Sequence, residues 1–234
     1  WLVERRAKGP AGRFQPTSVK LMVDGIIENG TAAMLEPYLD GHGHATGNGG
    51  KDFIDPAVLA EAVVRLDALG FQPHFHAIGD RAVRHALDAI EAARRANGWT
   101  DTRPQVAHLQ VVHPDDLPRF RKVGALANAQ PYWAVLEEQM TELTLPVLGP
   151  VVSERQYPFR SLRDNGATLA LGSDWAVSTP DPFLQMEVAV TRVTPSAGPS
   201  GCYVIDRRDG ERHLVAQQTA PPPSRHELDA LVSD

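Results

Sequence analysis

Four residues of types that can bind metal ions each stand near the end of an apolar, strand-like run. They are Lys20 after TSV, His76 in FQPHFHAIGD, His108 in QVAHLQ and Asp174 in ATLALGSDW. Imidazole and carboxylate groups are common ligands of zinc. In a β/α barrel the carboxyl ends of the parallel strands converge, and chemistry takes place there. The spacing therefore predicts a metal-centred active site in a β/α fold.

Each of these residues also has an explanation without a metal. His76 lies where a strand gives way to a helix, so it could equally be a capping or core residue. Asp174 could cap a helix that begins in SDWAVSTPD. Lys20, taken alone, reads as a lysine that reaches solvent from a strand edge. The recurrence of such residues at successive strand ends favours the metal site.

Lys20 is the unusual member of the set, because dications repel an ammonium group. If the strand buries Lys20 beside metal ions, its pKa should fall. The neutral amine can then react with carbon dioxide to form a carbamate. This reaction would convert a cation into a carboxylated lysine that can bridge two metal ions.

The segments between these residues alternate between strand and helix patterns. The first predicted helix is DPAVLAEAVVRLDALG. Asp55 is its expected N-cap, Pro56 its first helical residue and Gly70 its end. Strands are expected within 18–25, 71–78, 104–112, 125–131 and 167–174, and helices within 55–70, 79–98, 113–124, 135–143, 158–166 and 183–193. Such alternation predicts right-handed crossovers and a parallel sheet, either a barrel or an open doubly wound sheet.

The region after Asp181 carries a weaker pattern. A helix is expected in FLQMEVAVTRV, and CYVIDRRDGERHLVA could form a hairpin that turns at Asp209 and Gly210. The Pro-rich tail is expected to lie loosely on the surface. We therefore predict a partial barrel domain over residues 1–194 and an irregular C-terminal extension over residues 195–234.

Composition narrows the class of protein. A chain of 234 residues, 42% of them hydrophobic, can bury the core of one large α/β domain. A net charge of -6 with scattered Lys and Arg argues against a nucleic-acid groove. The single cysteine, Cys202, excludes an internal disulfide. No apolar run approaches the roughly 20 residues of a membrane helix, so the default expectation is a cytoplasmic protein without a membrane partner. The chain opens on Trp1 rather than Met, which leaves an upstream targeting signal open.

Five motifs in this order and spacing resemble amidohydrolase family 3, the YtcJ-like branch of the metal-dependent amidohydrolase superfamily. They are VKLMVDGIIENGTAAMLEPY, HAIGDRAV, VAHLQVVHPDDLPRF, ANAQP and LALGSDW, and the resemblance covers about residues 19–193. The resemblance implies a distorted (β/α)8 TIM-type barrel that holds one or two divalent ions, usually zinc, and hydrolyses amide-type C–N bonds. It also implies that Lys20 is the carbamylated bridging ligand, that His76 and His108 bind one metal, and that Asp174 binds the other and shuttles protons.

Two features depart from the family pattern. The His-x-His pair expected on the first barrel strand is absent before Lys20, and the sequence after Ser196 does not follow the family. The chain is therefore expected to be a middle-to-late piece of such an enzyme. Pairing with the missing barrel segment, or self-association, would cover its open strand edges.

Other polar residues near the motifs have weaker claims to the site. His42 and His44 form a His-x-His string in a glycine-rich loop, where a solvated loop is the favoured interpretation. His74 shares a strand face with His76 and is expected to support the ligands or face the substrate. Packing is an equally good explanation for four further residues that could line the pocket, namely Asp24, Gln110, Gln130 and Trp175.

In the whole enzyme, a metal-activated hydroxide is expected to attack the carbonyl of a small amide-type substrate, with Asp174 as general base and acid. The long loops 36–52 and 132–150 carry no motif that selects the substrate. The main alternative is a catalytically incompetent barrel remnant that retains part of the metal site. A TIM-barrel isomerase or lyase is disfavoured because the chain lacks a Gly-rich phosphate loop near the last strand.

Overall fold

The structure, a computed structural model, describes residues 1–9, 15–193, 195, 204–206 and 213–215. The chain divides into two compact units, one of residues 1–129 and 143–170, the other of residues 130–142 and 171–234. The domain boundary predicted at residues 194 and 195 stays a prediction. Within the described part, no helix is both long and apolar enough to cross a membrane.

A five-stranded sheet in the order β1-β2-β3-β4-β5 organises the first unit. The strands are β1 (Ser18–Met22), β2 (Gln72–Ala77), β3 (Gln105–His108), β4 (Leu126–Ala129) and β5 (Thr168–Leu171). Strands β1 to β4 pair in parallel, each with the next. All five lie within the predicted ranges, and the parallel α/β sheet that the alternation predicted is confirmed.

Helices connect the strands, as right-handed crossovers require. The first unit contains α1 (Leu2–Lys8), α2 (Pro56–Ala68), α3 (Asp80–Asn97), the 3-10 turn η1 (Pro114–Asp116), α4 (Arg119–Val123), α5 (Leu145–Ser153) and α6 (Phe159–Asp164). Asp55 caps α2 as predicted, because its carboxylate accepts the N–H groups of Ala57 and Val58. The single helix predicted over 113–124 is instead η1 followed by α4. Pro118 stands between them and has no N–H to continue the hydrogen-bond ladder.

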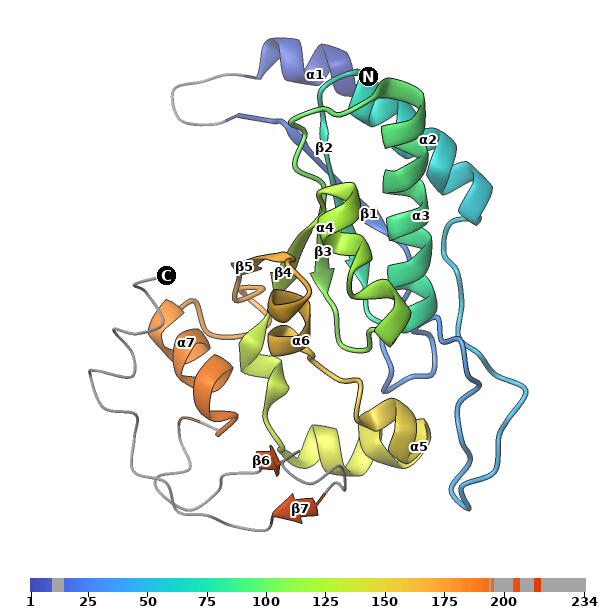
Figure 1. Ribbon diagram of the computed structural model, residues 1–234, viewed down its shortest axis with the longest axis vertical. Helices are drawn as coiled ribbons and strands as arrows, with labels where there is room; N and C mark the ends of the chain where they lie inside the picture. The colour runs from blue at the N-terminus through green and yellow to red at the C-terminus, as the bar shows by residue number, and fades with distance from the viewer. Residues whose placement is uncertain (10–14, 194, 196–203, 207–212, 216–234) are drawn as a thin grey trace. The chain divides into compact units, whose positions relative to one another are not determined.

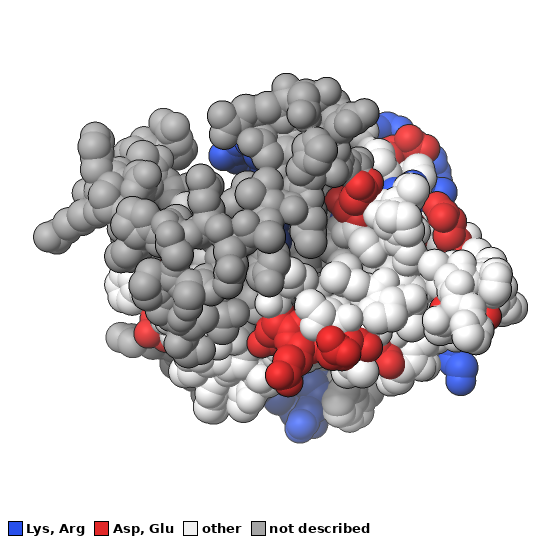
Figure 2. Space-filling model, turned by 90° about the horizontal axis from the view of Figure 1, so that it is seen from below, with Lys and Arg blue, Asp and Glu red and all other residues white. Residues whose placement is uncertain are grey.

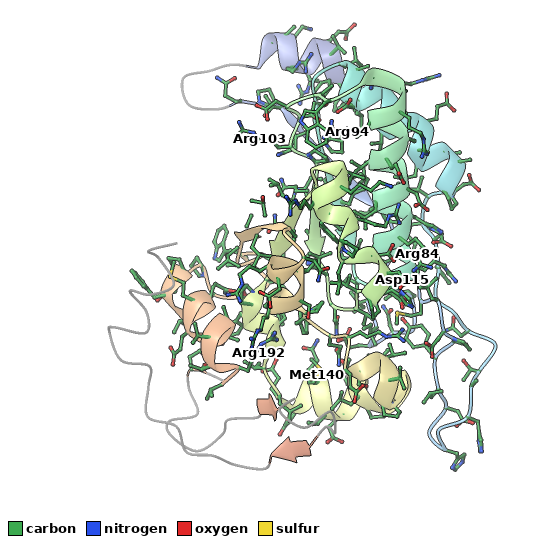
Figure 3. The ribbon with its side chains drawn as sticks, in the orientation of Figure 1. Arg84, Arg94, Arg103, Asp115, Met140 and Arg192 are labelled. Atoms are coloured by element: carbon green, nitrogen blue, oxygen red, sulfur yellow. The ribbon has the colours of Figure 1, made fainter. Side chains whose placement is uncertain are left out.

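The two faces of the sheet differ in chemistry. One face packs on helices α2 and α3, which lie side by side in Figure 1. Its core includes Phe75 and Val106 from the strands, with Leu59 from α2 and Leu87 from α3, all almost completely buried. Arg84 and Arg94, labelled in Figure 3, fasten α3 to its neighbours through Asp116 and the carbonyl of Val123.

The other face of the sheet is polar. A hydrogen-bonded ladder crosses four strands, in which Ser18 donates to Gln72, Gln105 donates to the same Gln72 oxygen, and Asn128 donates to Gln105. Because side chains alternate along a strand, Lys20, His74 and His76 belong to this same face. The candidate ligands of β1 and β2 therefore point away from the helix-covered core.

The second unit contains η2 (Pro131–Ala134) and α7 (Pro182–Thr191), which contact one another. The backbone N–H of Tyr132 donates to Gln185, and Asp181 caps α7 by accepting the N–H of Phe183. The π-helical segment η3 (Gln139–Thr144) lies in the region expected to hold a helical piece. Strands β6 (Val204–Asp206) and β7 (His213–Val215) pair antiparallel, as expected for the hairpin. The predicted turn at Asp209 and Gly210, and the tail, lie outside the described residues.

Candidate metal centre at the ends of strands β2 and β3

Two of the predicted ligands, His76 and His108, meet at the carboxyl end of the sheet. Their ring centroids lie 4.4 Å apart with the ring planes inclined at 61°. Each residue is only 9% exposed. Two partly enclosed imidazoles on adjacent parallel strands are a donor set suited to a divalent transition metal.

The backbone of His108 explains how the two rings meet. In the β2–β3 register His108 is opposite Ala77, whereas His76 is opposite Ala107. Regular alternation would therefore turn His108 toward the helix-covered face, away from His76. Instead His108 has a φ of 78° and Leu109 a φ of 53°, both in the left-handed region. This local twist, which strand alternation does not predict, accounts for the approach of the two rings.

His76 is held by the segment that follows β1. Its Nε2 lies 3.0 Å from the carbonyl oxygen of Gly25 and 3.8 Å from Oδ1 of Asp24. Because a carbonyl can only accept, Nε2 carries the proton in this contact, and Nδ1 is the ring nitrogen that can bind a metal. Gly25 was not among the predicted site residues. Its backbone contributes the contact, and the only sequence signal for it is the Asp-Gly turn after the strand.

Asp24 is completely buried beneath His76. Its two oxygens accept the N–H groups of Ala33, Ile78 and Gly79 at 2.9–3.0 Å. Burial raises the pKa of Asp24 to about 7, against the lowering effect of these three hydrogen bonds. Asp24 therefore supports the strand ends and has no exposed surface with which to line a pocket.

Lys20 lies on strand β1. It is exposed, as the alternative of a lysine that reaches solvent from a strand edge expects, and its role as a metal ligand stays a prediction. Strand β1 is an edge strand of the described sheet, which leaves its polar face open on one side. The Nζ atom of Lys20 lies 3.4 Å from Nε2 of His74, its register partner on β2. Lys20 and His74 thus form a pair. Because His74 precedes His76 by two residues on β2, this pair lies about 7 Å nearer the start of the strands than His76.

Gln110 lies just beyond His108, and its contacts are structural. It is 4% exposed, its side chain donates to Gln156, and its carbonyl accepts the N–H of Tyr157. These contacts fasten the segment before α6 to the end of β3. They favour the packing explanation for Gln110.

Three further predicted residues, Gln130, Asp174 and Trp175, belong to the second unit. Gln130 is buried and its carbonyl accepts the N–H of Trp133, whereas Asp174 and Trp175 are exposed. The alternative that Asp174 caps the next helix is wrong, since Asp181 does so. The convergence of Asp174 with the histidines stays a prediction.

The His-x-His string of the glycine-rich loop does not form a ligand pair. His42 and His44 are exposed, with ring centroids 6.3 Å apart. Their backbone N–H groups donate to Asp40 instead, and these two hydrogen bonds lower the pKa of Asp40. Across the whole described part of the chain, no group of three or more His, Cys, Asp or Glu side chains is arranged to hold a metal.

The charge distribution was expected to offer no basic surface. In the view of Figure 2, several acidic side chains gather at one place, and the visible Lys and Arg side chains stand toward the edges. The net charge of -6 has the same sign. The absence of a nucleic-acid partner stays a prediction.

Comparison with known proteins shows the family of this chain. The model of the amidohydrolase family matches residues 2–220, a wider range than the motifs alone suggested. The chain is 33% identical over 181 residues to LONG AFTER FAR-RED 3 of Arabidopsis thaliana, covering 76% of this chain and 29% of that protein. It is 26% identical over 211 residues to YtcJ of Bacillus subtilis (strain 168), covering 88% of this chain and 38% of that protein.

A solved structure supports the fold. The crystal structure of an uncharacterized metal-dependent hydrolase from Pyrococcus furiosus matches with a TM-score of 0.68 and 26% identity, covering 84% of this chain and 39% of the other. The five-stranded parallel sheet is consistent with the predicted partial TIM-type barrel, and the predicted resemblance is confirmed. The chain spans well under half the length of each of these three proteins. This chain belongs to the amidohydrolase family.

Proposed function

We propose that this chain carries part of the active site of a metal-dependent hydrolase that cleaves amide-type C–N bonds other than peptide bonds. The observation that carries the proposal is the pair of His76 and His108, with ring centroids 4.4 Å apart at the ends of adjacent parallel strands. This placement is the one that barrel enzymes use for catalysis. Membership of the amidohydrolase family supports the reaction class.

The two histidines fit a zinc ion as half of its coordination shell. His76 would bind through Nδ1, because its Nε2 is committed to the Gly25 carbonyl. His108 would supply the second imidazole. A catalytic zinc site commonly has three protein ligands, so at least one more group must complete the shell. When bound, a divalent ion would supply Lewis acidity toward the amide carbonyl and lower the pKa of water.

Lys20 is proposed to supply a further metal ligand, and Asp174 is proposed to transfer protons. Lys20 would attack carbon dioxide through its neutral amine, forming an N–C bond and releasing one proton, and the resulting carbamate would bind metal. His74, 3.4 Å from Lys20 Nζ, is in position to take part in a hydrogen bond with this group. Asp174 would accept a proton from the attacking water and deliver it to the leaving amine.

The test is metal-dependent turnover of small N-acyl and N-formyl amines by the native protein that contains this chain. We expect zinc to be required and Asp174→Asn to lower kcat by at least about 100-fold, the usual effect of removing a general acid or base. Asp181→Asn is a matched control, because it alters a capping carboxylate of the same unit that asparagine can replace. Unchanged turnover in Asp174→Asn would remove the proton-transfer assignment.

A second candidate is a barrel that binds metal without turning over substrate. The observation in its favour is that no described group of three or more ligand side chains is arranged for a metal. This candidate predicts zinc binding that depends on His108 and no hydrolysis of any N-acyl amine. The same assays therefore separate the two functions.

A further inference from the structure

The carboxylate of Asp24 connects three parts of the chain around His76. Its Oδ1 accepts the N–H of Ile78 at 3.0 Å, and its Oδ2 accepts the N–H groups of Ala33 and Gly79 at 2.9 Å each. Ile78 and Gly79 follow His76 in the chain, and Ala33 belongs to the loop after β1. A Cβ on Gly79 would collide with the backbone of Ala33, so these segments touch at the carboxylate.

Asp24 is also next in the chain to the group that holds the imidazole. Gly25 presents its carbonyl oxygen 3.0 Å from His76 Nε2, and Asp24 Oδ1 lies 3.8 Å from the same nitrogen. The carboxylate therefore fixes the backbone on both sides of the ring, after β1 and after β2. We infer that Asp24 is a positioning residue that acts through His76, setting the ring so that Nδ1 faces the metal site. This inference rests on the proposed function.

The acceptor count explains why a carboxylate suits this position. Two oxygens of an ionised or protonated aspartate can accept three N–H groups, whereas asparagine has one acceptor oxygen and would direct its amide N–H toward another donor. An isolated carboxyl group is costly to bury. At a position that only fills space, an apolar side chain would therefore give a more stable fold. Histidines that bind metals are usually oriented by hydrogen-bonded neighbours. Asp24 lies beside His76 in a position to orient it in this way.

Asp80 is a matched comparison. It is also completely buried and lies just after the same strand. Its Oδ1 accepts the N–H of Leu35 and its Oδ2 lies 3.9 Å from Arg155, whereas the carboxylate beside His76 is that of Asp24. Asp80→Asn therefore alters a buried carboxylate at the same end of the sheet without changing the setting of His76.

The first experiment uses the metal-free chain and reads the tautomer of His76 by nitrogen-15 NMR of the imidazole ring. We expect the wild type and Asp80→Asn to carry the ring proton on Nε2. Asp24→Asn, or Asp24→Ser if the asparagine variant does not fold, should give a mixture of tautomers. A wild-type proton on Nδ1, or an unchanged His76 spectrum in the folded Asp24 variant, would overturn the inference.

The second experiment measures zinc affinity by calorimetry in a double-mutant cycle. We expect Asp24→Asn to weaken zinc binding roughly 10- to 100-fold, the usual effect of losing a group that orients a ligand. In the His76→Ala background the same change should have little effect. An equal loss in both backgrounds would mean that Asp24 acts on the fold alone. If the wild type binds no zinc, the proposed function fails, while the tautomer experiment still decides the role of Asp24.

Discussion

His108 owes its place in the candidate site to its backbone conformation. A non-glycine residue with φ of 78° is strained, because its Cβ approaches the following carbonyl group. Strain of this kind tends to persist where the surrounding structure fixes it and where the side chain has a function. At His108 the strain accompanies the close approach to His76.

This strain predicts an unusual order of stability among variants. His108→Gly should be more stable than His108→Ala by about 1 kcal/mol, because glycine adopts positive φ without steric cost. At His76, which is not in the left-handed region, the order should reverse, with alanine favoured by about 0.5–1 kcal/mol. Urea denaturation of the four variants measures both differences. Alanine favoured at both positions would contradict the conformation described for His108.

Asp80 predicts a pH dependence of stability. Burial raises its pKa, against the lowering effects of the Leu35 N–H and Arg155. The folded protein then binds more protons than the unfolded chain at pH values above the ordinary aspartate pKa, so this group's contribution to stability is lost as pH rises through that window. Asp80→Asn removes the contribution. Its stability relative to the wild type should therefore improve from pH 4 to pH 7, as measured by thermal unfolding at several pH values.

The proposed carbamate of Lys20 depends on bound metal. A carbamate is an anion that metal ions normally stabilise, and the metal-free chain offers no such ion. We expect carbon-13 NMR with labelled bicarbonate to detect no carbamate in the metal-free chain. A carbamate signal that disappears in Lys20→Arg but forms without metal would contradict this account.

At the scale of elements, local signals decided where the helices begin and end. The carboxylate of Asp55 accepts two N–H groups at the start of α2, and Gly124 ends α4 with a φ of 68°. Such signals are encoded within a few residues, so they can be recognised without knowing the tertiary structure. The break between η1 and α4 also has a local cause, because Pro118 lacks the N–H that a continuous helix needs.

The cap of α2 gives a prediction at this scale. Asp55→Ala should lower the free energy of unfolding by about 1 kcal/mol, because two N–H groups in the first turn lose their acceptor. Glu61→Ala, on the same helix, removes an exposed ion pair with Arg65 and should cost less than about 0.5 kcal/mol. Chemical denaturation compares the two variants. Equal losses would mean that the Asp55 cap does not stabilise the helix.

At the scale of the whole molecule, the proposed metal site links His76 and His108, which lie 32 residues apart in the chain. A ligand that binds only the folded state stabilises it in proportion to the logarithm of its concentration over Kd. The affinity of two imidazoles alone should be weak, so the effect should appear at zinc concentrations well above those that saturate a complete site.

Zinc should therefore raise the unfolding midpoint of the wild-type chain but have much less effect on His108→Ala. His85→Ala is a suitable control, since His85 on α3 lies 3.1 Å from Asp52 in the loop before α2 and is not one of the two histidines of the candidate site. Thermal unfolding across a zinc titration tests this, with calorimetry as a direct measure of binding. An equal zinc response in all three proteins would exclude His108 from the site.

The sequence by itself predicted the five strands of the sheet, their parallel alternation and the candidate ligands His76 and His108, because strand patterns, caps and turns are local. It did not predict helices α1 and α5. It also carried enough separate motifs to identify the family. The tertiary structure decided the environments, which depend on neighbours distant in sequence. It exposed Lys20 on an edge strand, buried Asp24 among three backbone N–H groups, and turned His108 toward His76 through a backbone twist that alternation cannot predict. Burial and ring orientation are set by packing between segments, so no pattern within a single segment specifies them.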